Sequence, residues 1–230
     1  MTIQRFEQNI NEVNDRIATA AAKAGRAADD VTLVGVTKYV DAAVTREFAE
    51  AGHRVLGENR PQLMWQKQET RADLDIEWHL IGHLQRNKAK RMVELATLIH
   101  SVDSLRLLKA IDGFAAEQDK VARVLLEVNV SGEEAKHGFT PAELPSIVEA
   151  VEGFAATQVD GLMAMAGLAG DQNDARREFA SLRELADRIA SMGLPANVQM
   201  KDLSMGMSGD FEIAIQEGAT LVRVGSALFK

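Results

Sequence analysis

The sequence predicts an α/β protein, a single (β/α)8 TIM-type barrel with an extra N-terminal helix, which takes up residues 1–230 as one domain. Strand and helix signals alternate from end to end, as a parallel sheet covered by helices requires. Eight strand signals can be counted, and 230 residues is a usual length for a closed barrel. An open doubly wound sheet is the alternative, because periodicity alone does not say whether the sheet edges meet.

The first predicted helix covers residues 5–24, where Ile10, Val13 and Ile17 recur at helical spacing before the first strand. Short apolar or β-branched runs predict the strands, at residues 32–36, 54–56, 76–81, 98–100, 121–128, 158–162, 199–201 and 220–224. Helical patterns separate them, at residues 42–51, 61–69, 88–96, 104–118, 141–151, 174–192 and 211–217.

Composition excludes several classes of function. The net charge of -8 argues against general binding to a nucleic-acid backbone, and zero Cys excludes disulfides, thiolate metal sites and thiol nucleophiles. No apolar run is long enough to span a bilayer, and the polar first ten residues do not resemble a secretory signal. We therefore expect a cytoplasmic protein.

Lys38 is the first candidate for chemistry, because it directly follows the apolar run Val31–Val36 and Thr37. In such a barrel the reactive groups lie at the carboxyl ends of the strands. Desolvation there would lower the pKa of the amine and leave it able to condense with an aldehyde. A lysine whose charged end merely reaches solvent from a strand end is the commoner reading of position alone.

Two segments near the C-terminus are candidates for holding a phosphate. The first is 203–210, rich in Gly and Ser and placed before the last predicted helix, where backbone N–H groups, the Ser208 hydroxyl and the helix dipole would favour an anion. The second contains Gly225 and Ser226 after the eighth strand. Loops after strands seven and eight are the recurrent phosphate site of such barrels. Simple helix capping by Ser208 or Asp210 is the alternative.

Arg223 lies two residues before Gly225, so both face the same side of the strand. If the ligand held at Gly225 carries a pyridine ring, a permanent cation beside the ring nitrogen would keep that nitrogen unprotonated. The ring would then be a weaker electron sink. Pairing with an acidic neighbour inside the barrel is the alternative. Of the histidines, only His79 and His83 are close enough in sequence to suggest a metal, and without a helical H-E-x-x-H spacing we favour local hydrogen bonding instead.

Taken together, the motifs resemble the pyridoxal phosphate homeostasis protein family (YggS/PROSC type), which is related to the N-terminal barrel of alanine racemase. The matching segments run through nearly the whole chain in the expected order: 34–38, 57–62, 78–88, 100–104, 127–131, 136–139, 161–165 and the two phosphate segments. The chain departs from the family in having Thr37 where Ser is frequent before the lysine, and in stopping at Lys230 where many relatives continue.

The resemblance implies a pyridoxal 5'-phosphate (PLP) cofactor and a role for each candidate. Lys38 would form the internal aldimine, a Schiff base, and Arg223 would face the pyridine nitrogen. The phosphate would be held by Ser208, Gly225 and Ser226. The remaining pocket would be lined by Asn59, His79 and Met165.

A complete racemase site is not expected, because racemisation needs a second acid–base group that alanine racemase takes from a second domain across a dimer. The only tyrosine, Tyr39, should point away from Lys38 if strand alternation continues, in a core-packing or rim position. The resemblance therefore implies a cofactor carrier in vitamin B6 homeostasis that passes PLP to apo-enzymes. The absence of the second domain removes one dimer contact and favours a monomer. A weak amino-acid racemase or other PLP enzyme, and a cofactor-free Schiff-base aldolase, are the alternatives.

Overall fold

The computed structural model of the chain describes residues 2–69, 74–133, 137–167 and 170–230. Among the segments that carry the family resemblance, only Lys136 lies outside these ranges. The described helices do not include one that is long and apolar enough to cross a membrane.

The strands close into one barrel in the order β1 to β8, and each neighbouring pair is parallel. Closure confirms the predicted barrel and excludes the open sheet. The strands are β1 (Thr32–Val36), β2 (Val55–Glu58), β3 (Glu77–Leu80), β4 (Leu98–Val102), β5 (Ala122–Glu127), β6 (Thr157–Met163), β7 (Val198–Met207) and β8 (Leu221–Val224).

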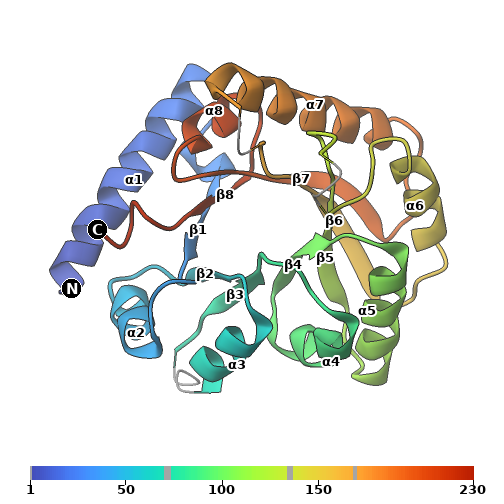
Figure 1. Ribbon diagram of the computed structural model, residues 1–230, viewed down its shortest axis with the longest axis horizontal. Coiled ribbons are helices and arrows are strands. Elements are labelled where there is room, and N and C mark those ends of the chain that lie inside the picture. The colour runs from blue at the N-terminus through green and yellow to red at the C-terminus, as the bar shows by residue number, and fades with distance from the viewer. Residues whose placement is uncertain (1, 70–73, 134–136, 168–169) are drawn as a thin grey trace.

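Helices surround the strands as a ring (Figure 1). They are α1 (Ile3–Lys23), α2 (Ala42–Glu50), α3 (Pro61–Glu69), α4 (Arg86–Leu95), α5 (Leu105–Glu117), α6 (Leu144–Val151), α7 (Gln172–Ala190) and α8 (Phe211–Gln216), with the short 3-10 helix η1 (Ala28–Asp30). The N-terminal helix α1 precedes β1 as predicted, and it packs between α8 and α2. It thereby covers the junction of β8 and β1, where a helix after β8 would otherwise be needed.

Polar caps fix where several helices begin. Asp41 accepts the Val44 N–H at 2.9 Å at the start of α2, and Ser104 accepts the Leu107 N–H at 3.3 Å at the start of α5. Asp171 caps α7 by accepting two backbone N–H groups. Such caps satisfy N–H groups that the helix itself leaves unpaired. The predicted start of α6 at residue 141 is wrong, because three turn residues come first and Pro145 stands in the first helical turn.

Strand β7 is much longer than the predicted 199–201, and this changes where the phosphate loop begins. Leu203, Ser204 and Met205 continue the strand, which bulges between Ser204 and Met207. Their Gly- and Ser-rich sequence suggested a loop, whereas they alternate between the two faces of the barrel wall and are buried. Gly206 adopts a φ of 89°, and a Cβ there would lie 2.5 Å from the Ala214 side chain, so only glycine fits.

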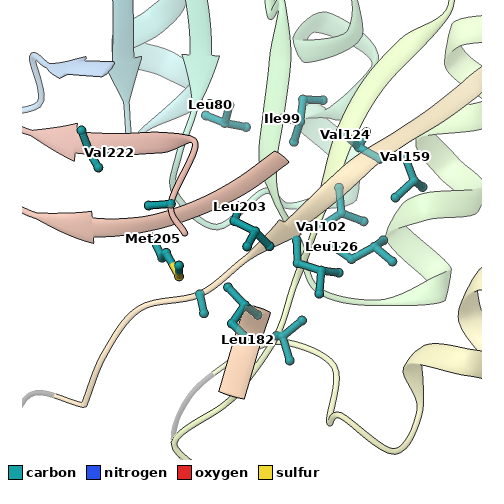
Figure 2. Close-up of a cluster of buried hydrophobic side chains, with 14 of the residues drawn as sticks. Leu80, Ile99, Val102, Val124, Leu126, Val159, Leu182, Leu203, Met205 and Val222 are labelled. Carbon is teal, nitrogen blue, oxygen red and sulfur yellow. The ribbon is translucent and has the colours of Figure 1, made fainter. Parts of the chain in front are cut away.

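The main hydrophobic core is the outer wall of the barrel, which we define as the apolar layer between the strands and the helices. Figure 2 shows part of it, with Leu80, Val124 and Leu126 on strands and Leu182 on α7. A second, smaller cluster lies in the lumen and joins strands around the barrel: Val34, Leu98, Leu125, Met163 and Leu221. The lumen is therefore filled, and any cavity must lie above this cluster.

Candidate functional site

A cavity of about 420 Å³ lies at the carboxyl end of the barrel. All of the predicted cofactor residues except His79 line it, together with Tyr39 and Gly82: Lys38, Asn59, Met165, Ser208, Arg223, Gly225 and Ser226. They come from the ends of β1, β2, β6, β7 and β8, far apart in sequence. The cavity volume falls in the usual range for small-molecule sites, about 300–1,000 Å³.

Lys38 lies in the turn that follows β1 and is half-buried in the cavity wall. Of the two positions expected for its neighbour Tyr39, core or rim, the structure shows the rim, but the expected direction of the side chain is wrong. The strand ends at Val36, so alternation does not continue, and Tyr39 is 89% exposed rather than packed in the core. Its ring centroid lies 4.9 Å from the Lys38 Nζ, so the ring faces the lysine instead of pointing away. Tyr39 thus belongs to the rim.

A buried ion pair supports the turn that carries Lys38. Lys67 Nζ lies 2.5 Å from the Glu58 carboxylate and donates a 2.7 Å hydrogen bond to the carbonyl of Thr37, the residue before Lys38. The other Glu58 oxygen accepts the Asn59 N–H at 2.9 Å. One buried pair therefore fixes the backbones that present both Lys38 and Asn59.

Sequence reasoning missed this pair, although a signal for it existed. Lys67 lies on the buried face of α3, at helical spacing from Pro61 and Met64. A lysine on a buried helix face is rare unless it is paired. Its partner could not be identified from the sequence, because Glu58 ends a strand and gives no local indication of burial.

The phosphate candidates meet as expected, but not through helix capping. Ser208 Oγ accepts the Gly225 N–H at 3.1 Å, which joins the loops after β7 and β8. Asp210 makes no side-chain cap on α8 and instead accepts the Met207 N–H at 2.5 Å. Because α8 has only six residues, its dipole is small, and the serine hydroxyls are the donors that this part of the cavity offers.

Arg223 is held rigidly below these donors. It is 4% exposed, and its Nη1 donates to Ser204 Oγ while its Nη2 donates to the Ala164 carbonyl at 2.9 Å. Burial lowers the pKa of Arg223 to about 10, partly offset by Asp210 and Glu127, so the guanidinium stays charged at neutral pH. The cavity thus has a fixed positive charge in its floor.

His79 does not line the cavity with the other described residues and lies in the lumen below it, 5% exposed. Its Nδ1 is 3.0 Å from Nε2 of His100, whose Nδ1 is 2.8 Å from Ser204 Oγ. Since β4 and β7 are not neighbours, the bond between His100 and Ser204 crosses the lumen. We call His79, His100, Glu127, Ser204 and Arg223 the lumen polar layer.

The histidines of this layer are neutral at physiological pH. Desolvation, with a smaller contribution from Arg123, lowers the pKa of His79 to about 4. Desolvation, His79 and Arg223 lower the pKa of His100 well below its ordinary value. A guanidinium only donates, so Ser204 accepts from Arg223 and its own proton is left for His100. Arg223 then donates to Ser204, Ser204 donates to His100, and His100 donates to His79.

Carboxyl groups near the cavity have the opposite shift. Burial raises the pKa of Glu127, with a further contribution from the nearby Asp103, and burial also raises the pKa of Asp210. Arg223 opposes both shifts. These acids interact electrostatically with Arg223, whereas the hydrogen bonds of its guanidinium go to Ser204 and Ala164.

Asn59 offers an unused polar atom to the cavity. Its Oδ1 is buried and has no hydrogen-bond partner among the described residues. An unpaired buried carbonyl destabilises the protein unless something else binds it. Gly82 faces the same residue, and a Cβ at position 82 would lie 2.2 Å from the Asn59 carbonyl oxygen. The cavity wall is therefore closely fitted here, with a polar group left for a ligand.

His79 and His83 do not come together. His79 lies in the lumen, whereas His83 lies on the rim, with its Nδ1 3.0 Å from Asp103 Oδ2. A further cavity of about 550 Å³ lies between α6 and the end of α7, but it is lined by Glu149 and Glu152 and by no lysine or arginine of the described chain. Of these two cavities, the one at the carboxyl end brings a lysine amine together with serine hydroxyls and an arginine.

The chain belongs to the family of alanine racemase N-terminal domains, whose model matches residues 2–230. Within that class it is 42% identical over 222 residues to the pyridoxal phosphate homeostasis protein of Aquifex aeolicus (strain VF5), with 96% of each chain covered. It is 41% identical to the protein of the same name from Pseudomonas aeruginosa. These matches confirm the family expected from the sequence motifs.

A solved structure of PipY from Synechococcus elongatus PCC7942, with PLP bound, superimposes with a TM-score of 0.82 at 36% identity. The match covers 93% of this chain and 100% of that one. An alanine racemase of Clostridium difficile 630 matches with a TM-score of 0.75 at 14% identity, which shows a shared fold.

Proposed function

We propose that this chain binds PLP in the cavity at the carboxyl end of the barrel and acts in vitamin B6 homeostasis as a cofactor carrier. The observation that carries the proposal is that the Lys38 amine, the hydroxyl groups of Ser208 and Ser226, and Gly225 line one cavity. The names of the relatives from Aquifex aeolicus and Pseudomonas aeruginosa, and the PLP bound to PipY, support it.

The residues present suit this cofactor. PLP supplies an aldehyde, which bonds covalently to a primary amine, and a phosphate, which needs hydrogen-bond donors. Lys38 is the only lysine among the described residues that line the cavity, and the hydroxyl groups of Ser208 and Ser226 are the donors, with Gly225 between them and the Arg223 strand. The unpaired Oδ1 of Asn59 is a further polar contact, and Met165 is an apolar one.

Arg223 is the residue that favours carriage over catalysis. It only donates hydrogen bonds, and its charge persists at neutral pH. A fixed cation near a pyridine nitrogen disfavours protonation of that nitrogen, which limits how far the ring can stabilise a carbanion. Ser204 and Ala164 hold the guanidinium in place, so it cannot move aside.

One observation favours an amino-acid racemase as a second candidate, since Tyr39 lies beside Lys38. Racemisation needs acid–base groups on both faces of the substrate, and the high exposure of Tyr39 gives its hydroxyl no fixed position. Deuterium exchange at Cα of single-enantiomer amino acids discriminates the two. We expect none above the level of free PLP, and sustained exchange that is lost in Tyr39→Phe would replace the carrier proposal.

Cofactor binding is tested by the visible absorbance of the protein after incubation with PLP and desalting. Wild type and Lys109→Ala, which removes an exposed lysine on α5, should retain the band, and Lys38→Ala should lose it. Equal absorbance in all three proteins would reject binding through Lys38.

Delivery is the finer part of the proposal: a cytoplasmic monomer that passes PLP to apo-enzymes. The loaded protein should reactivate a PLP-dependent apo-enzyme faster than an equal amount of free PLP does. Reactivation no faster than with free PLP would reject delivery and leave storage as the role. Sedimentation of the loaded chain measures its oligomeric state.

A further inference from the structure

Three side chains on the rim, which are not among the residues lining the Lys38 cavity, come together in a pattern that suits a metal ion. His83, Asp103 and His137 lie in the loops after β3, β4 and β5, and their donor atoms all lie within 4.8 Å of one another. Both imidazoles direct Nδ1 toward the same Asp103 oxygen, at 3.0 Å from His83 and 3.8 Å from His137.

We propose that His83, Asp103 and His137 form a binding site for a divalent transition-metal ion, zinc in the first instance, with at least one coordination position open to solvent.

The donor spacing fits such an ion. Zinc binds imidazole nitrogen and carboxylate oxygen at about 2.0–2.2 Å, which places neighbouring donors of a tetrahedron about 3.3–3.6 Å apart. The two distances to Asp103 lie on either side of that value. Two histidines with one carboxylate leave a fourth position free, as in zinc sites that bind water or a ligand. Imidazole with carboxylate also suits other first-row ions, including iron and nickel.

The three side chains differ in their exposure to solvent, in a way that suits a site that takes up an ion from solution. The Asp103 side chain is 9% exposed, whereas those of His83 and His137 are 47% and 64% exposed. The anionic ligand is therefore fixed in the protein, and the two neutral ligands face the solvent from which an ion arrives. Their rings stack with centroids 4.5 Å apart and planes 20° apart. At least one exposed ring must therefore turn out of the stack when both nitrogens bind one ion.

The backbone holds each ligand in place. Ser101 Oγ donates to the Gly82 carbonyl at 2.6 Å, which ties the loop of His83 to the strand that precedes Asp103. After His137, the Phe139 N–H donates to the Glu127 carbonyl at 2.8 Å. Gly138, with a φ of 114°, allows this close approach, because a Cβ there would lie 2.9 Å from the Glu127 carbonyl oxygen. The backbone beside the ligands is therefore fixed before an ion binds.

The candidate metal site adjoins the cavity at the carboxyl end of the barrel. His83 directly follows Gly82, which lines the PLP cavity. A bound ion would therefore stiffen one wall of that cavity, although the site itself is independent of whether PLP binds.

The test is zinc titration of the untagged full-length chain by isothermal calorimetry, after chelator treatment and desalting. Wild type should bind one ion per chain with micromolar or tighter affinity. Asp103→Asn and His137→Ala should each weaken binding at least about tenfold, since even loss of a partner outside the coordination shell weakens metal sites about 10–100-fold. Asp29→Asn, which changes an exposed acid in η1, is the matched control and should bind as wild type does.

Cobalt provides a second readout, because four-coordinate Co²⁺ absorbs visible light much more strongly than the hydrated ion. The band should appear with wild type and be absent with His137→Ala, whose exposed position leaves folding intact if Asp103→Asn does not fold. No stoichiometric zinc binding by wild type, or binding unchanged in both variants, would overturn the proposal. Neither outcome bears on the PLP absorbance of the Lys38 experiment, so the two proposals fail separately.

Discussion

The two faces of the barrel wall differ in how they are stabilised. The outer wall is apolar, and side chains such as Leu126 and Val222 are held by burial against helices. The lumen is apolar only at the level of Leu98 and Leu221, and above it the lumen polar layer is held by hydrogen bonds across the barrel. The hydrophobic effect does not depend on the orientation of a side chain, whereas a hydrogen bond needs a donor and an acceptor at a defined distance and angle. The fold thus depends mainly on the outer face, and the site on the inner one.

The largest expected effect comes from removing one member of the buried ion pair. Lys67→Met leaves the Glu58 carboxylate buried without its cation, and breaking such a pair destabilises a protein by about 3 to 5 kcal/mol. Urea unfolding measures this loss. The double variant Lys67→Met with Glu58→Leu should recover most of it. If the double variant lost as much stability as the sum of the losses in Lys67→Met and Glu58→Leu, the two side chains would not be coupled.

Removing a buried side chain from the outer wall should lower stability by a similar amount, but it should leave PLP binding unchanged. Leu126→Ala removes a fully buried side chain and should lower the free energy of unfolding by about 3 to 4 kcal/mol. The PLP absorbance per folded molecule should stay unchanged. A parallel loss of absorbance would show that the two faces of the wall are not separable.

Stability should fall as the solution is made acidic. The pKa of His79 is lowered to about 4 in the folded state, so between pH 6.5 and 4 the unfolded chain binds a proton that the folded one does not. The contribution of His79 to the free energy of unfolding is therefore fully present above pH 6.5. It is lost as the pH falls to 4, which amounts to about 3 kcal/mol. Glu127 and Asp210, with raised pKa values, act in the opposite direction near the lower end of that range.

Urea unfolding across this pH range measures the slope. His79→Asn should flatten it, and His137→Gln, which changes an exposed histidine, should not. An unchanged slope in His79→Asn would contradict a neutral, buried His79.

The smallest effects should come from two serines on the same segment. Ser204→Ala leaves His100 and Arg223 without their shared hydroxyl and should reduce stability by about 1 to 3 kcal/mol. Ser208→Ala, in the half-exposed loop, should barely change stability but weaken PLP binding. Calorimetric unfolding and PLP titration separate the two, and equal effects from both substitutions would contradict the distinction between lumen and cavity.

The outer wall explains why the fold could be predicted from the sequence. Its apolar residues recur with the period of a helix or a strand, so every predicted element was found, and most boundaries moved by only one to three residues. The cavity residues were predicted from their positions at strand ends and from the family motifs. The single-domain organisation, the monomeric state and the role of each cavity residue stay predictions.

The lumen polar layer could not be predicted in the same way. The partnership of His100 with Ser204 joins strands separated by 104 residues, and it depends on the register of the closed barrel rather than on any local pattern. The Gly- and Ser-rich end of β7 suggested a loop, because composition does not reveal that a bulged strand continues there. The direction of Tyr39 was wrong for a related reason, since β1 ends at Val36 as predicted and its alternation does not continue to residue 39.

The most direct test of the central claim is to locate the amine that holds PLP. The loaded wild-type chain is reduced with borohydride, digested and analysed by mass spectrometry. We predict one pyridoxyl phosphate label per chain, on Lys38, and its loss when Ser208 and Ser226 are both replaced by alanine at limiting PLP. A label spread over several lysines, or concentrated on a residue other than Lys38, would contradict the account.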